Sequence, residues 1–129
     1  YTVLVAGGDM EEPIADEVRG ILDGHIVLER ALGARNRWPA IDILASLSRV
    51  MPQVTSEDHR AAANRVRAIL ATYEAQRDLI VLGAYKAGSD ARVDEAISKI
   101  DAVENFLKQR SDESVAFAET LQQLNALLS

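Results

Sequence analysis

The chain has 129 residues, of which 48% are hydrophobic and only 5% aromatic, a composition that favours packed helices over a β-sandwich. Its formal net charge of -6 argues against a dedicated nucleic-acid-binding protein, because phosphate contacts need clustered Lys and Arg side chains. It has no cysteine and only two histidines, His25 and His59, so neither a disulfide framework nor a metal centre is predicted. No apolar run approaches the roughly 20 residues that a membrane-spanning helix needs.

The first half of the chain alternates short apolar runs with Gly, Pro and Asp. In chain order, the predicted elements are a buried strand at Tyr1–Val5, a helix at Pro13–Leu22, a strand at His25–Leu28, a short helix at Ala31–Gly33 and a strand at Ile41–Leu44. This order is typical of an α/β domain. The strands are too few to close such a domain, and the chain starts on an apolar run without Met, so we expect a piece of a longer protein.

From Thr55 onward the pattern is helical. Ser56 can cap a first helix, Ser89-Asp90 a second, and Ser111-Asp112-Glu113 is predicted to open a third. Apolar residues recur at helical spacing in all three: Val66, Ile69, Leu70 and Tyr73; then Val93, Ile97, Ile100, Val103 and Leu107; then Phe117, Leu121, Leu124 and Leu128. Three amphipathic helices with short connections predict a small helical bundle.

Few residues predict chemistry by themselves. No Gly-x-x-x-x-Gly-Lys-[Ser/Thr] string occurs, so the chain is predicted not to hold a nucleotide's phosphates alone. Adjacent carboxylates such as Asp94 and Glu95 are expected on the solvated surface, and His25 is expected to be packed or hydrogen-bonded. Arg49 follows a strand-like segment, where α/β sites are built. Taken alone, that position favours a structural ion pair.

Longer strings carry a resemblance to a known family. They are Leu-Asp-Gly-His-Ile-Val-Leu at 22–28, Pro-Ala-Ile-Asp at 39–42, Ser-Leu-Ser-Arg-Val-Met at 46–51 and Leu-Gly-Ala-Tyr at 82–85. Over essentially its whole length the chain resembles the ATPase of type III secretion systems, both injectisome and flagellar, which is similar to F-type and V-type ATPase subunits. It departs from the family at Arg37-Trp38, where His-Tyr is usual.

The resemblance implies a fold class of α/β plus α. Residues 1–54 would be the C-terminal part of a RecA-like nucleotide-binding domain, and residues 55–129 a helical C-terminal domain. It also implies that Arg49 is an arginine finger, which reaches across a subunit interface to the γ-phosphate bound next door. Such a cation is worth about 10³–10⁵ in rate in comparable systems.

Two further sites are implied by the same resemblance. Trp38 and Pro39 would form part of an adenine pocket, with Phe117 as the candidate second aromatic residue, although Phe117 could equally be an ordinary core residue. The loop residues Tyr85, Lys86, Ala87 and Gly88 would contact a central coiled-coil stalk protein.

The whole machine implied is a homohexameric, cytoplasmic ATPase at the inner-membrane base of a secretion apparatus. It would use ATP and Mg²⁺ to release chaperones and unfold export substrates, together with a stalk and a peripheral stator or regulator protein. This chain alone would be inactive and bind neither cofactor. Two alternatives stay open: a rotary F- or V-type subunit, and a helical binding module without a catalytic role. Phe117–Leu121 favours an injectisome enzyme over a flagellar one.

Overall fold

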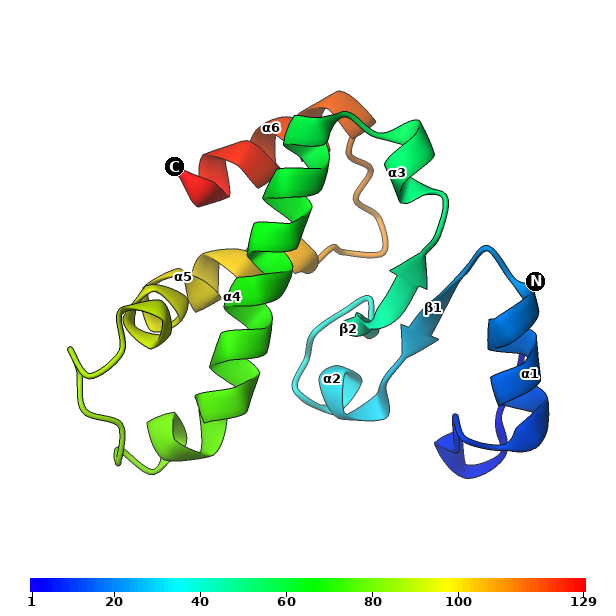
Figure 1. Ribbon diagram of the computed structural model, residues 1–129, viewed down its shortest axis with the longest axis horizontal. Coiled ribbons are helices and arrows are strands. Elements are labelled where there is room, and N and C mark those ends of the chain that lie inside the picture. Colours follow the sequence, from blue (N-terminus) through cyan, green and yellow to red (C-terminus); the bar gives the residue numbers. More distant parts are fainter.

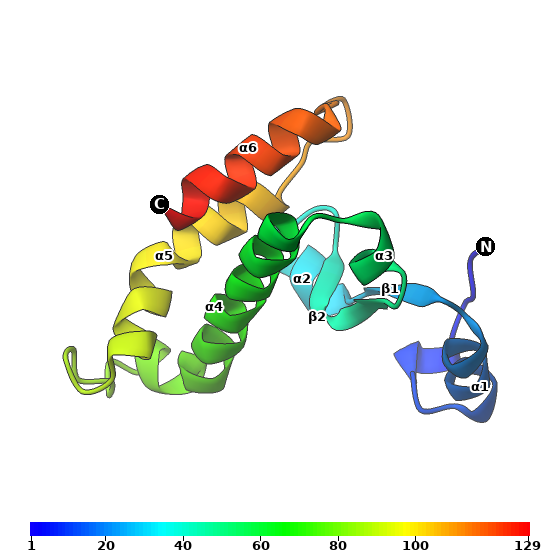
Figure 2. The ribbon, with the colours of Figure 1, turned by 45° about the horizontal axis from the view of Figure 1, so that its top comes forward.

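The computed structural model describes residues 1–129 and is mainly helical, with one two-stranded antiparallel sheet (Figure 1). In chain order the elements are the 3-10 helix η1 (Ala6–Gly8), α1 (Pro13–Ile21), β1 (Gly24–Leu28), α2 (Arg30–Ala34), β2 (Ile41–Ser48), α3 (Met51–Val54), α4 (Glu57–Val81), α5 (Ala91–Leu107) and α6 (Phe117–Leu128). The α4–α5 loop (Leu82–Asp90) and α1 lie at opposite ends of the molecule, with the sheet between them (Figures 1 and 2).

The helical bundle of α4, α5 and α6 holds the main core. As predicted, α4 begins after Ser56, whose hydroxyl accepts the N–H of His59 at 3.2 Å, and α5 begins after Asp90, whose carboxylate accepts the N–H of Arg92. Eight buried residues from the three helices pack together: Ala62, Val66, Ile69, Leu70, Ala96, Ile100, Val103 and Leu124. Most of these come from the predicted apolar stripes, so helical periodicity located this core correctly.

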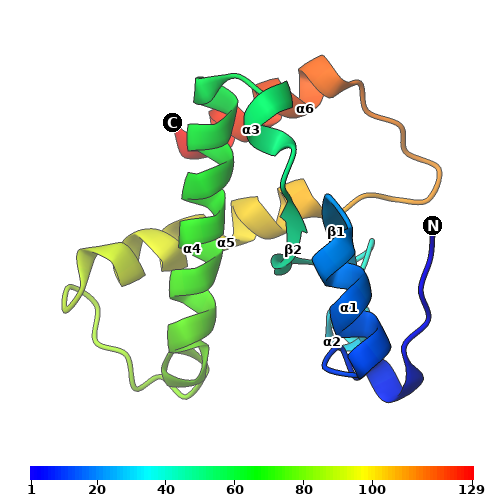
Figure 3. The same ribbon diagram turned by 45° about the vertical axis from the view of Figure 1, so that its right-hand side comes forward.

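The third helix starts later than its sequence predicts. Ser111-Asp112-Glu113 does not open α6, which begins only at Phe117. The side chain of Arg110 holds Asp112 at 2.6 Å, and the Glu113 carboxylate accepts the Arg110 N–H at 3.1 Å. The acids therefore stabilise a local turn instead of a helix start. The segment between α5 and α6 leaves the bundle as an extended loop (Figure 3).

Tyr1–Val5 is not a strand, contrary to the sequence prediction. It has no regular structure, and Tyr1 and Leu4 are almost fully exposed. A strand needs a partner for its backbone groups, and the sheet contains only β1 and β2. The other predicted strands and helices of this half are present. β2 extends four residues beyond its predicted end, to Ser48, and the short helix α3 was not predicted.

A bulge interrupts β2. His25 pairs with Leu47 and Val27 pairs with Asp42, so Ile26 alone faces the four residues Ile43–Ser46. Within this bulge segment (Ile43–Ser46), two N–H groups donate to Asp42 Oδ1 at 2.9 and 3.0 Å, and the Ser46 hydroxyl donates to the Asp42 carbonyl at 2.5 Å. The bulge is therefore an ordered structure with its own hydrogen bonds.

Several sets of polar contacts join the sheet region to the helical bundle. Arg67 of α4 donates to carbonyls of the bulge segment, Arg37 forms an ion pair with Glu104 of α5 at 3.4 Å, and the Gln109 N–H donates to the Trp38 carbonyl at 2.8 Å. The first set connects elements that also pack directly, since α4 contacts β2. The sheet and the bundle are therefore held together over residues far apart in the sequence.

The chain exposes more surface than a compact protein of its size. Its accessible area is 9262 Å², and only 12 of 129 residues are buried, whereas a compact monomer of 14.1 kDa exposes about 6,700 Å². Many exposed large apolar side chains lie before residue 29, namely Tyr1, Val3, Leu4, Ile14, Ile21, Leu22, Ile26 and Leu28. This end of the molecule is suited to contact with other protein surfaces. No helix is both long and apolar enough to cross a lipid bilayer.

Candidate functional site

Arg49 directly follows β2, where the chain turns towards α3. Its N–H donates to the Asp23 carbonyl at 2.7 Å, and its Nη1 donates to the carbonyls of Arg19, at 3.2 Å, and Leu22. These carbonyls lie at the C-terminal end of α1, whose dipole favours a cation. The expected structural ion pair is absent, because no carboxylate lies within salt-bridge distance of Arg49.

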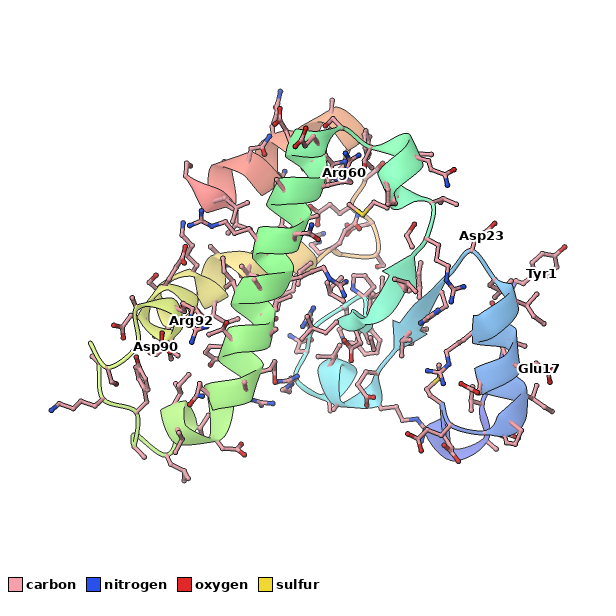
Figure 4. All side chains as sticks on the ribbon, in the orientation of Figure 1. Tyr1, Glu17, Asp23, Arg60, Asp90 and Arg92 are labelled. Carbon is pink, nitrogen blue, oxygen red and sulfur yellow. The ribbon has the colours of Figure 1, made fainter.

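The rest of the Arg49 guanidinium is free. Both side-chain hydrogen bonds come from Nη1, so Nη2 and Nε have no protein partner, and the residue is exposed. Asp23, which anchors the Arg49 backbone, lies at the turn between α1 and β1 (Figure 4). The carbonyls therefore hold one edge of the guanidinium and leave the others to bind an anion.

Trp38 lies against α2. A Cβ built on Gly33 would stand 2.9 Å from two carbons of the indole ring, so glycine leaves the space that the ring occupies. Trp38 is nevertheless 57% exposed, and Pro39, joined to it by a cis peptide bond, is exposed as well. One part of the indole is therefore supported by the protein, and another part is open for stacking on a planar ligand.

Phe117, the first residue of α6, is 69% exposed and is not a core residue. Its ring lies edge-to-face on His59 of α4, with the ring centroids 6.0 Å apart. Phe106, by contrast, packs against the core. Phe117 therefore packs on α4, whereas Trp38 packs on α2. The two proposed adenine-pocket residues contact different elements and do not contact each other.

The α4–α5 loop is built around one carboxylate. The Tyr85 hydroxyl donates to Asp94 Oδ1 at 2.9 Å, and the Gly88 N–H donates to both carboxylate oxygens of Asp94, at 3.0 and 3.2 Å. Asp94 is thus partly buried and fully engaged, which corrects the expectation that it lies on the solvated surface. Lys86 and Ala87 remain exposed at the loop tip. The loop therefore has an ordered and exposed end.

A second carboxylate stabilises the start of α5 beside this loop. The side chain of Arg92 donates to Asp90 at 3.1 Å (Figure 4), and this hydrogen bond holds the pKa of Asp90 below its ordinary value of 3.8. The same contact raises the pKa of Arg92. Both groups are therefore charged near neutral pH, and the cap of α5 persists under those conditions.

A charged groove lies where α2, α4 and α5 meet, and sequence reasoning missed it. It is lined by the cations Arg35, Arg37, Arg77 and Lys108 and by the acids Glu74, Asp101 and Glu104, among other residues. Arg35 and Arg77 both approach Glu74, at 4.0 and 3.8 Å. Arg37 is the one buried charged residue. Two ion pairs of this groove, Arg35–Glu74 and Arg37–Glu104, join the sheet region to the helical bundle. The groove therefore contributes to the packing of the two parts.

The described chain has neither a metal centre nor a phosphate-binding loop. No group of three or more His, Asp or Glu side chains is arranged to hold a metal ion. His25 is hydrogen-bonded, as predicted: its Nε2 lies 3.1 Å from the Ala45 carbonyl, so Nε2 carries the proton. What the chain does offer is a free arginine edge, an exposed indole and an ordered loop.

Comparison with known proteins identifies the fold as the C-terminal part of a RecA-like nucleotide-binding domain followed by an α-helical domain. Residues 55–126 match the family model "T3SS EscN ATPase C-terminal domain", and residues 1–48 match "ATP synthase alpha/beta family, nucleotide-binding domain". The chain belongs to the family of type III secretion and flagellar export ATPases.

Similar proteins come from both branches of this family. The chain is 50% identical to a type 3 secretion system ATPase of Xanthomonas euvesicatoria and 51% identical to a flagellum-specific ATP synthase of Bacillus subtilis, in each case over 98% of this chain and 29% of the relative. It thus spans less than a third of the length of these relatives.

Two solved structures resemble the whole fold. The assembled ATPase EscN of the enteropathogenic E. coli type III secretion system is 40% identical with a TM-score of 0.95, over 100% of this chain and 31% of that one. EscN in complex with its central stalk EscO is 41% identical with a TM-score of 0.85, over 91% of this chain and 29% of that one.

Proposed function

We propose that this chain is part of an ATP-hydrolysing subunit that works as a homohexamer and energises type III protein export, with Arg49 as an arginine finger acting in trans. The observation that carries the proposal is the exposed guanidinium after β2, held at Nη1 and free at Nη2 and Nε. A free planar fork can bind two oxygens of a phosphoryl group. The chain holds no phosphate-binding loop, so that phosphate must belong to a site built largely by other residues.

The relatives support this reading. One is named a type 3 secretion system ATPase and another a flagellum-specific ATP synthase, and one similar structure is described as an assembled ATPase. In the proposed mechanism, the neighbouring subunit binds ATP and Mg²⁺, and Arg49 stabilises the charge that develops on the transferring phosphoryl oxygens. Residues 1–54 belong to the nucleotide domain and residues 55–129 to the helical domain. The isolated chain binds neither ATP nor Mg²⁺ and is inactive.

The test is Arg49→Ala in the complete subunit. The proposal predicts that kcat falls by about 10³ while the Kd of the nucleotide stays nearly constant, because the finger acts in the transition state. Arg30→Ala is the matched control, since Arg30 is an exposed arginine at the start of α2 with no side-chain hydrogen bond or ion pair. An unchanged kcat in the Arg49 variant would refute the assignment.

Trp38 and Pro39 are proposed to line the adenine side of the nucleotide site, with Phe117 from another element closing it. The exposed indole and the exposed Phe117 ring support this, because both offer an aromatic face to a planar base. Trp38→Ala should raise the KM for ATP more than it lowers kcat. Since Phe117 is supported separately on His59, Phe117→Ala should leave the position of the indole unchanged.

Tyr85, Lys86, Ala87 and Gly88 are proposed to contact a coiled-coil stalk protein. A stalk partner is in keeping with the similar ATPase EscN, which has been solved in complex with its central stalk EscO. The peripheral regulator, the chaperone–substrate complexes and a cytoplasmic location at the inner-membrane base are further parts of the proposal. The alternatives are a rotary F- or V-type subunit and a helical binding module without catalysis. Pull-down of stalk and chaperone–substrate complexes, with and without residues 1–54, separates the last reading from the motor reading.

A further inference from the structure

The bulge in β2 leaves four carbonyl groups without strand partners, and side chains satisfy all of them. Arg67 Nη1 donates to the carbonyls of Ile43, at 2.6 Å, and Ser46, at 3.4 Å, and Arg67 Nη2 donates to that of Leu44 at 3.3 Å. The fourth carbonyl, of Ala45, accepts a hydrogen bond from His25 Nε2 at 3.1 Å. One arginine of the helical bundle therefore holds three of the four carbonyls of the bulge segment.

The bulge segment stands directly before the proposed finger. It ends at Ser46, and after it Leu47 and Ser48 pair with β1 again. The next residue, Arg49, donates its N–H to the Asp23 carbonyl at 2.7 Å. The path of the bulge thus sets where β2 ends and in which direction the Arg49 side chain leaves the sheet.

We infer that Arg67 is a positioning residue for the Arg49 finger. By donating hydrogen bonds from α4 to three carbonyls of the bulge segment, it holds the end of β2 in the geometry that lets Arg49 reach a neighbouring subunit's phosphate. The inference rests on the proposed function of Arg49. It ties the helical bundle to the reacting centre through a single side chain, which the strand pairing of β1 and β2 does not do.

Arginine suits this role better than lysine does. A guanidinium offers several N–H groups in one rigid plane, which matches carbonyls that lie side by side, whereas an ammonium is a single point donor. Leu44 is exposed, so water can replace the donor that its carbonyl loses when Arg67 is removed. Its loss should therefore disturb the direction of the strand end more than the stability of the fold.

The first experiment compares Arg67→Ala and Arg67→Lys with Arg65→Ala in the complete subunit. Arg65 lies two positions earlier on α4 and pairs with Glu95 at 2.5 Å, so its loss removes the same charge without touching the bulge. Arg67→Ala should lower kcat by about tenfold or more with KM for ATP within about twofold, since small misplacements of a catalytic group cost this much. Arg67→Lys should fall between that variant and wild type, and Arg65→Ala should match wild type.

The second experiment asks in which subunit Arg67 acts. Subunits carrying Arg67→Ala are mixed with subunits that have an inactivated phosphate-binding loop but intact Arg49 and Arg67. If Arg67 positions a finger that works in trans, the second subunits supply good fingers to the active sites of the first. The mixture should then hydrolyse ATP faster than the two separate assemblies added together.

Mixing Arg49→Ala subunits in the same way separates the two proposals. Rescue of both variants supports the inference. Rescue of Arg49→Ala but not of Arg67→Ala overturns the inference and leaves the proposed function standing, whereas failure to rescue Arg49→Ala overturns the proposed function itself. If Arg67→Ala does not assemble, Arg67→Lys carries the test, and full wild-type kcat in that variant contradicts the need for a planar fork.

Discussion

Gly33→Ala should move the indole of Trp38 without unfolding the protein. The new Cβ would stand 2.9 Å from two ring carbons, whereas carbon atoms normally pack at about 3.5–4.0 Å. The ring must therefore shift by about 0.6–1.1 Å, which it can do because Trp38 is 57% exposed. The backbone gains helix propensity of up to about 1 kcal/mol when alanine replaces glycine in α2. The displaced ring loses a few contacts of about 0.1–0.2 kcal/mol each.

These opposing effects leave global stability within about 1 kcal/mol of wild type, but they change the environment of the indole. Trp38 is the one tryptophan of the chain, so intrinsic fluorescence reports on it alone. The Gly33→Ala chain should show a red-shifted emission maximum and faster acrylamide quenching, and Trp38→Phe provides the blank. Unchanged emission and quenching in the folded variant would refute the packing of the indole on Gly33.

Three further predictions concern the groove and the α4–α5 loop. Glu104→Gln should lower the free energy of unfolding by about 1–3 kcal/mol in urea titrations, because buried Arg37 loses its anion; an unchanged midpoint would contradict this. Tyr85→Phe should speed amide hydrogen exchange in the loop but not in α4, as the hydroxyl that bonds α5 is lost; equal exchange would show that the hydroxyl does not order the loop. Because the Arg92 hydrogen bond lowers the pKa of Asp90 in the folded state, its stabilisation is present above pH 3.8 and fades as pH falls through the lowered value. In Asp90→Asn, the temperature of thermal unfolding should fall less at acid pH than it does in wild type. A pH dependence identical to that of wild type would count against the contact.

Periodicity and capping made the helical bundle predictable. Val66, Ile100 and Val103 recur at helical spacing and are buried where expected, and the caps at Ser56 and Asp90 are present. Such signals are local, so a sequence displays them directly. The fold class and the family could be predicted for the same reason, since both depend on contiguous strings.

Non-local contacts were the part that sequence could not reveal. Tyr1–Val5 has the composition of a strand but no strand to pair with, and pairing is a property of the sheet. The acids after Arg110 fit a helix start and a local turn equally well, and a side-chain contact decides between them. Arg67 lies 24 residues from Ile43, so nothing in either local pattern announces their hydrogen bond.

The role proposed for the Arg49 guanidinium can be tested by a structure of the assembled complete subunit with a non-hydrolysable ATP analogue and Mg²⁺. We expect Nη2 or Nε to lie about 2.7–3.2 Å from an oxygen of the γ-phosphate bound by the neighbouring subunit. An occupied site in which Arg49 points only to the carbonyls of Arg19 and Leu22, away from any phosphate, would contradict it.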